Sequence, residues 1–206
     1  MMRSFAMVVA IVALVGGMAG AQQEFTDVDL SGARFVRSNL QRAYVERCAL
    51  TELQMTQITE ATRLTLSHCR FGQSQWRYVV LDDPKLEYSR IEGLRGYDVE
   101  FDEWQVEQSD ITDIYLRYCD LRELELENCS LRDLDAEYCD IPSGRWRNVD
   151  FGYGNFEGCD WSDSRFYRGS FEDARFSNVD LTDAEFENCD IRGLVINGVR
   201  IDELID

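Results

Sequence analysis

An apolar residue recurs at every fifth position of this chain, from Phe25 to Ile201, and this period limits the folds that the sequence can adopt. The register slips once, by one residue, between Met55 and Ala61, and Gly96 is the one position in the series that is not apolar. Only 45% of the whole chain is apolar, so chance would fill fewer than half of these positions. A period of five fits neither a helix (about 3.6 residues) nor a flat strand (about two residues). Self-similarity at a fixed period is typical of a solenoid.

Small side chains form a second pattern, because they recur two residues before the apolar positions. All seven cysteines stand there, and the residue between the two is often Asp or Asn. In the C-terminal half the pattern sharpens into a ten-residue unit, as in CDLRELELEN and CSLRDLDAEY. We expect the bulky and the small side chain both to point inward, the small one near a corner. The cysteines are Cys48, Cys69, Cys119, Cys129, Cys139, Cys159 and Cys189.

These residues resemble the pentapeptide-repeat family, whose loose consensus is A(D/N)LXX, over about residues 23–205. The resemblance implies an all-β fold, a right-handed, four-sided parallel β-helix in which four pentads make one coil. A coil of about 20 residues gives roughly nine coils, each of which buries its apolar face by stacking on its neighbours. Because no linker divides the repeat, we predict one β-helix domain over residues 22–206.

Residues 1–21 do not belong to the repeat. They have a short basic start with Arg3, an apolar run from Phe5 to Val15, and the small residues Ala19, Gly20 and Ala21. This order predicts a secretory signal peptide cleaved after Ala21, and therefore a secreted or periplasmic protein that does not insert in a membrane after cleavage. The alternative is an uncleaved membrane anchor, for which the apolar run is short.

Export bears on the cysteines, since exported proteins favour disulfides and an odd number leaves at least one thiol unpaired. On a 20-residue coil, Cys119, Cys139 and Cys159 stack with their Cα atoms about 4.8 Å apart. Their Cα–Cβ bonds would be parallel, so a disulfide would require a local distortion that brings the Cβ atoms closer together. Two interpretations therefore stay open: small apolar filler, or at least one bridge. We expect no metal and no cofactor, because the sequence has no C-x-x-C pair and His68, its one histidine, should face outward.

The formal net charge of −18 argues against direct nucleic-acid binding, which requires Lys and Arg against the phosphates. We also expect no enzyme activity, because the chain has no nucleophile motif and no glycine-rich phosphate loop. The acidic residues include a predicted outward column of Asp120, Asp140, Asp160 and Asp180. This column is either a solvated face, where neighbours repel by only about 1 kcal/mol, or a stripe that contacts a cationic partner or a divalent ion.

Three functions fit these observations. The first is an exported, non-enzymatic scaffold that presents flat acidic faces to a protein partner, with the aspartate column as the contact stripe. The second is DNA mimicry: some relatives in the family are acidic rods that occupy the DNA-binding groove of a type II topoisomerase, although a signal peptide argues against a cytoplasmic target. The third is recognition of a cation, a glycan or a mineral by regular columns.

The irregular parts of the repeat give two further predictions. We expect the register slip near residues 56–60 and Gly96 to be the weak points of the rod, with a local bulge or distorted coil around Gly96, where Pro84, Leu94 and Trp104 stand at positions for small residues. From about residue 194 the chain departs from the repeat, and this segment either caps the last coil of a monomer or forms a C-terminal, end-to-end dimer interface.

Overall fold

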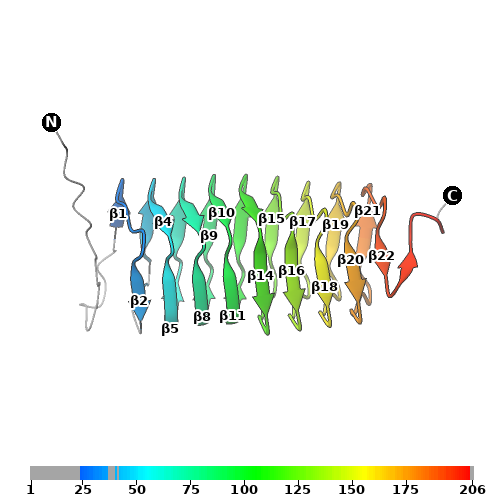
Figure 1. The fold of residues 1–206 in the computed structure, drawn as a ribbon, viewed down its shortest axis with the longest axis horizontal. Coiled ribbons are helices and arrows are strands. Elements are labelled where there is room, and N and C mark those ends of the chain that lie inside the picture. Colours follow the sequence, from blue (N-terminus) through cyan, green and yellow to red (C-terminus); the bar gives the residue numbers. More distant parts are fainter. Residues whose placement is uncertain (1–23, 37–39, 41, 205–206) are drawn as a thin grey trace.

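The computed structural model describes residues 24–36, 40 and 42–204. Within these residues all regular structure is β-strand, wound into one rod with the first coil at one end and the last at the other (Figure 1). Strands on successive coils are parallel, with partners 20 residues apart along most of the rod. The predicted all-β parallel β-helix is therefore confirmed. The predicted signal peptide lies outside the described residues, among which no helix has the length and hydropathy to cross a membrane.

Three hydrogen-bonded sheets run along the rod, and we name their sides faces A, B and C. Face A takes one strand from each coil: β1 (Glu24–Thr26), β3 (Tyr44–Glu46), β6 (Thr65–Ser67), β9 (Lys85–Glu87), β12 (Gln105–Glu107), β15 (Glu125–Glu127), β17 (Arg145–Arg147), β19 (Arg165–Tyr167) and β21 (Glu185–Glu187). Face B has β4 (Ala49–Thr51), β7 (Arg70–Gly72), β10 (Arg90–Glu92) and β13 (Asp110–Thr112). Face C has β2 (Arg34–Val36), β5 (Gln54–Thr62), β8 (Gln75–Asp82), β11 (Arg95–Asp102), β14 (Ile114–Arg117), β16 (Leu134–Glu137), β18 (Asn155–Glu157), β20 (Arg175–Ser177), β22 (Val195–Ile196) and β23 (Val199–Arg200).

The fourth side, face D, begins as the second halves of the long strands β5, β8 and β11. It continues as single bridges between successive coils, from Glu100 to Asp120 and on to Asp180. Face B changes in the same way after β13, where single bridges replace the strands. The rod thus has four sides, as predicted, but only faces A and C keep strands along the C-terminal half.

The ten-residue unit of the sequence reflects this difference between adjacent sides. On faces B and D the Asp before the apolar residue accepts a hydrogen bond from the backbone N–H two residues later, as Asp160 does from Ser162 at 2.8 Å. The chain then closes a tight turn, in which the Ser164 N–H donates to the Trp161 carbonyl oxygen at 3.3 Å. Asp and Ser suit such turns because their side chains bond to nearby backbone. One turn side and one strand side together make ten residues.

The core fills the bore of the rod. The central residue of most pentads is buried, and aromatic rings stack from coil to coil, such as Phe156 on Phe176 with centroids 4.7 Å apart. At the corners, the residue two places after the central one adopts a positive φ in nearly every coil. Asn, Asp and Gly tolerate this conformation best, which explains why they recur there.

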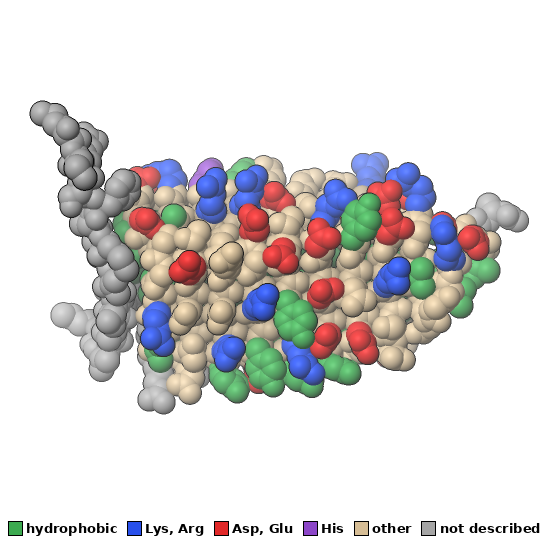
Figure 2. Space-filling model, in the orientation of Figure 1, with side chains coloured by type: hydrophobic (Ala, Val, Ile, Leu, Met, Phe, Trp, Pro, Cys, Tyr) green, Lys and Arg blue, Asp and Glu red, His purple; other side chains and the backbone are tan. Residues whose placement is uncertain are grey.

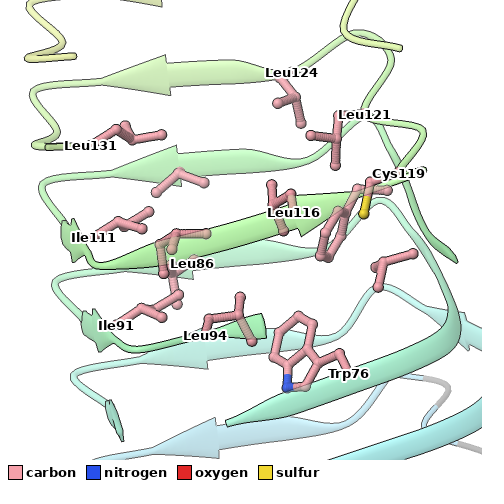
Figure 3. Packing of buried hydrophobic residues seen from close by; sticks show 14 of the residues in the cluster. Trp76, Leu86, Ile91, Leu94, Ile111, Leu116, Cys119, Leu121, Leu124 and Leu131 are labelled. Atoms are coloured by element: carbon pink, nitrogen blue, oxygen red, sulfur yellow. The ribbon is translucent and has the colours of Figure 1, made fainter. Parts of the chain in front are cut away.

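The register slip of the sequence is visible in the structure, because the pairing of β5 with β8 shifts between Ile58 and Ala61. The prediction of a distorted coil around Gly96 is wrong, because β11 pairs with β8 and β14 without a shift. Leu116 on the next coil takes the space that Gly96 leaves: a Cβ on Gly96 would lie 2.8 Å from its Cδ2 atom. Figure 3 shows Leu94, Leu116 and Trp76 extending together into the bore.

All seven cysteines are free thiols, and six are buried. The column of Cys119, Cys139 and Cys159 continues on earlier coils as Val99 and Val79, so valine and cysteine share one environment. This equivalence supports the interpretation of cysteine as small apolar filler. Burial also raises the pKa of the Cys69 thiol to about 11, which keeps it in the unreactive protonated form.

The last coil ends in a hairpin. Strands β22 and β23 pair antiparallel, unlike every other named pair of the described residues, and the Ile201 N–H donates to the Leu194 carbonyl oxygen at 2.9 Å. Leu194 is buried, but Phe186 is 37% exposed and Leu204 is 68% exposed. The predicted segment from residue 194 thus covers part of the last coil and leaves apolar surface beside it.

Candidate functional site

A shallow groove of about 610 Å³ lies on face A. Charged side chains line it in rows that follow the coils, and these charges pair with one another. Arg145 contacts Glu125, and Arg165 lies 3.5 Å from Glu185. Because each arginine already has a carboxylate on a neighbouring coil, the groove offers little uncompensated positive charge to a ligand.

The four aspartates of the predicted stripe form one column on face D, bridged from coil to coil. Three of them are engaged. Asp120 binds the guanidinium of Arg122 at 2.5 and 2.8 Å, Asp160 accepts the Ser162 N–H, and Asp180 accepts both the N–H and the hydroxyl of Thr182, at 2.9 and 2.6 Å. Asp160 and Asp180 thus cap their own turns, and Asp120 pairs with an arginine side chain.

Asp140 differs from the rest because the residue two places later is Pro142, which has no N–H to donate. Partial desolvation, followed by the charges of Asp120 and Asp160, raises the pKa of the Asp140 carboxyl. The opposite holds at the end of the column, where the Thr182 hydroxyl and N–H lower the pKa of Asp180. The column therefore contains one carboxylate whose charge is not compensated by its own turn.

This contrast predicts opposite effects of the same substitution. Above its raised pKa the charged Asp140 costs stability, so Asp140→Asn should raise the melting temperature at pH 7, and the gain should vanish as the pH falls below 3.8. Asp180 stabilises the fold above 3.8 and loses this contribution as the pH falls through its lowered pKa, so Asp180→Asn should lower the melting temperature at pH 7, and this loss should shrink as the pH falls below 3.8. Thermal melts between pH 7 and pH 3 would measure both, and shifts of the same sign would contradict the assignment.

No group of three or more His, Cys, Asp or Glu side chains in the described part of the chain is placed to hold a metal ion. His68 lies exposed at a corner, as predicted, where its ring stacks on Tyr88 with centroids 5.1 Å apart. Its Nδ1 atom is 2.9 Å from the Ser67 hydroxyl. These contacts hold the His68 ring against Tyr88, the corner residue of the next coil.

A row of tyrosines that the pentad pattern does not predict lies at the corner between faces C and D. Tyr78, Tyr97, Tyr118 and Tyr138, which we name the tyrosine edge, are 38–54% exposed. Successive rings contact one another, with centroids 6.3, 5.7 and 5.5 Å apart. Figure 2 shows apolar side chains gathered with Arg, Asp and Glu along the lower border of the view, below the middle coils. In the sequence, only Tyr118 and Tyr138 are 20 residues apart, and Tyr78 stands two coils before Tyr118 in the same column.

The backbone of the tyrosine edge is unfavourable for tyrosine. Tyr78, Tyr118 and Tyr138 all have φ of 54°, a left-handed conformation that costs a residue other than glycine about 1–3 kcal/mol. The row ends at Gly158, where a Cβ would lie 2.8 Å from the Tyr138 ring. Gly158 therefore leaves space for that ring to lie against the next coil.

Charged side chains flank the tyrosine edge on both sides. On the face C side, the Arg117 guanidinium lies 4.9 Å from the centre of the Tyr118 ring and 3.3 Å from Glu137. On the face D side, Asp120 and Asp140 each follow a corner tyrosine by two residues, and the cysteine between them points into the core. The aspartate column and the tyrosine edge thus run side by side.

Three solved structures are similar to this rod. HetL, a pentapeptide repeat protein involved in heterocyst differentiation regulation from the cyanobacterium Nostoc sp., is 18% identical over 85% of this chain and 88% of its own, with a TM-score of 0.50. Rfr23, a pentapeptide repeat protein from the cyanobacterium Cyanothece, is 15% identical over 44% of this chain and 63% of its own, with a TM-score of 0.42. QnrB1, a plasmid-mediated fluoroquinolone resistance protein, is 14% identical over 85% and 91%, with a TM-score of 0.36.

At such identities the likeness concerns the fold alone, and no curated protein matches the sequence significantly. The sequence itself carries the family signal. The family model for pentapeptide repeats matches with eight copies, at residues 23–57, 147–183 and 170–202. These matches lie at both ends of one uninterrupted rod, whose coils each hold four pentads. The chain belongs to the pentapeptide-repeat family.

Proposed function

We propose that this protein is an exported, non-enzymatic binding protein that contacts a protein partner through the tyrosine edge. The observation that carries the proposal is the row of four exposed tyrosine rings that contact one another from coil to coil. Three tyrosines adopt a backbone conformation that suits Asn, Asp or Gly better, and their rings stay about half exposed, so burial returns little of the cost. Exposed, ordered tyrosines are typical of protein interfaces, where their rings supply contact area and their hydroxyls bond to the partner.

The rest of the described surface supports binding in preference to catalysis. Its sides carry regular rows of polar side chains, and the groove on face A is shallow and lined by ion pairs. Members of this fold family generally act as structural or binding proteins. Export is the second part of the proposal, and it rests on the order of basic, apolar and small residues in positions 1–21.

The test compares two corners of the same rod. Tyr118→Asn with Tyr138→Asn removes the middle of the tyrosine edge, and asparagine fits the left-handed backbone, so the variant should fold at least as well. The control is Tyr88→Asn with Tyr153→Asn, at two other corners that have the same backbone conformation. After crosslinking in native cells, we expect a partner on the wild type and on the control variant, and none on the edge variant.

Fractionation of the same cells tests export. We expect the chain, processed after Ala21, in the periplasm or the medium.

Equal crosslinking of both double variants would rule out the tyrosine edge as the contact surface. Recovery of the unprocessed chain on a type II topoisomerase in the cytoplasm would replace the proposal by DNA mimicry.

A further inference from the structure

We propose that the C-terminal end of the rod binds an extended segment of a partner protein in which an aromatic residue stands between two basic residues. The segment adds one strand to face A, parallel to β21. This site lies on a different face from the tyrosine edge, and the inference goes beyond the binding function proposed above. It is carried by a last coil that is capped only in part, and by a segment within the rod that shows what fits the open part.

The C-terminal hairpin caps one side of the last coil. On earlier coils, N–H groups at the corners donate to carbonyl oxygens of the following coil. On the last coil, the Asn197 side chain accepts the Asn178 N–H at 2.8 Å, and the Asp202 carboxylate accepts the Gly193 N–H at 2.9 Å. Leu194 is 2% exposed there. The hairpin, which extends beyond the last coil in Figure 1, thus closes the end of the rod around face C.

The end of faces D and A stays open. The N–H groups of Leu181, Asp183 and Asn188 have no acceptor among the described residues. Strand β21 pairs with β19 on one edge and with no described strand on the other. Phe186, at the centre of β21, stacks on Phe166 with centroids 4.6 Å apart and is still 37% exposed. An open strand edge beside an exposed aromatic ring is a surface to which an extended segment can add.

The rod contains a covered counterpart of this open segment. Residues 120–129 read DLRELELENC, and residues 180–189 read DLTDAEFENC. The earlier segment is followed by a further coil, on which β17 pairs in register with β15. There each N–H group equivalent to an open one has a carbonyl acceptor on the next coil. The bonds run from Leu121 to Asp140 at 2.7 Å, from Glu123 to Pro142 at 3.2 Å and from Asn128 to Arg147 at 2.9 Å.

The covering strand β17 shows which side chains fit. Arg145 pairs with Glu125, and a guanidinium nitrogen of Arg147 lies 3.6 Å from Glu127. Between the two arginines, Trp146 points inward and is 3% exposed. An acidic–apolar–acidic strand is thus covered by a basic–aromatic–basic strand inside the rod.

Strand β21 repeats the acidic–apolar–acidic order and has no such cover. Glu185 has one exposed ion pair, with Arg165 on the preceding coil at 3.5 Å. Glu187 lies 3.3 Å from the Asn188 amide nitrogen and pairs with no basic side chain of the described residues. A basic–aromatic–basic segment from a partner would place its cations against Glu185 and Glu187 and its ring on Phe186, where aromatic pairs are favourable.

The test uses a labelled peptide that copies the covering coil. Its sequence is that of residues 140–149, with Asp140→Asn so that it brings no carboxylate next to Asp180. Fluorescence anisotropy with the mature protein, at about 0.15 M salt, measures the affinity. A control peptide exchanges Trp146 with Arg147, which keeps the composition and breaks the alternation of inward and outward side chains. We expect the control peptide to bind at least about threefold more weakly.

Glu185→Gln with Glu187→Gln should weaken binding of the first peptide about 3- to 30-fold, because both ion pairs with the peptide are lost. The matched control is Glu125→Gln with Glu127→Gln, which removes the same charges from the same face on a strand that is paired on both edges. This strand lies three coils, or roughly 14 Å, from β21, which is beyond the screening length at this salt. The control should therefore change the affinity less than about twofold. Equal losses in the two variants would reduce the effect to general charge and overturn the inference.

Amide hydrogen exchange followed by NMR separates strand addition from loose electrostatic attachment. At a peptide concentration ten times the Kd, exchange at the N–H groups of Leu181, Asp183 and Asn188 should slow about tenfold. The N–H groups of Asn178 and Gly193, which already have acceptors, should exchange as before. Binding without slower exchange at the three open groups would overturn the inference.

Two further outcomes decide against the site. Equal affinity for the two peptides, or no affinity for either, would refute it. A protein that is dimeric in light scattering and binds no peptide would assign the open end to a second copy of the chain. The variant Tyr118→Asn with Tyr138→Asn should bind the first peptide like the wild type, so a failure of the tyrosine edge and a failure of this site are distinguishable.

Discussion

Replacing Phe166 with alanine is expected to lower the free energy of unfolding by about 3–5 kcal/mol. The ring is 1% exposed and lies in the aromatic stack of face A, with centroids 6.0 Å from Trp146 and 4.6 Å from Phe186. It also contacts Trp161 and Phe171 from other sides of the bore. Such surroundings cannot collapse into the space, because rigid rings on adjacent coils hold one another in place, so the substitution should leave a cavity.

The adjacent residue supplies the control. Arg165→Ala should cost less than about 0.5 kcal/mol, because its side chain is 71% exposed and its ion pair with Glu185, at 3.5 Å, is open to solvent. Urea denaturation followed by circular dichroism and by tryptophan fluorescence would measure both variants. Equal losses would mean that the inward and outward positions of the pentad have been exchanged.

Truncation after Gly193 is expected to lower the free energy of unfolding by about 5 kcal/mol and to cause aggregation. The deletion removes the buried Leu194, worth about 1.5–3 kcal/mol, and the partly buried Ile196 and Ile201, each of which contributes less than that. It also removes β22, which pairs with β20, and so leaves an unpaired strand edge at the end of face C. Light scattering at several protein concentrations would follow the association.

The same measurement separates the two roles predicted for this segment. A monomeric full-length protein whose truncated form aggregates has a cap, whereas a dimer that the deletion converts into a soluble monomer has an interface. Leu204→Ser is the control for the cap, because a side chain that is already 68% exposed should contribute little to a monomer.

Much of the fold could be predicted because the regular positions of the pentad are the ones that form the core. A bulky residue at every fifth position and a small one two places before it are enough to specify the coil, and the bulge near Ile58 follows from one extra residue in that count. The regular coil at Gly96 could not be predicted from its own pentads, since it depends on Leu116 from the next coil. Packing between coils compensates for one missing side chain, and a count along the chain does not show this.

The candidate site was harder to predict, because its residues stand at the corners, outside the pattern that defines the repeat. The aspartate column was found from its spacing, but the difference between Asp140 and Asp160 depends on one proline, and on a hydrogen bond that only the folded turn contains. The tyrosine edge was missed because Tyr97 stands one residue before the corner, so the rings form a row only once neighbouring coils are stacked.

The left-handed corners also bear on how such a rod can evolve. At a corner, the side chain leaves the coil without touching the bore, while the core positions lie two residues earlier and three residues later. Recognition and folding thus depend on different positions of the same pentad. Substitutions at one corner can therefore add or remove surface contacts coil by coil. A protein of this architecture can acquire a new partner while the residues that specify its core stay the same.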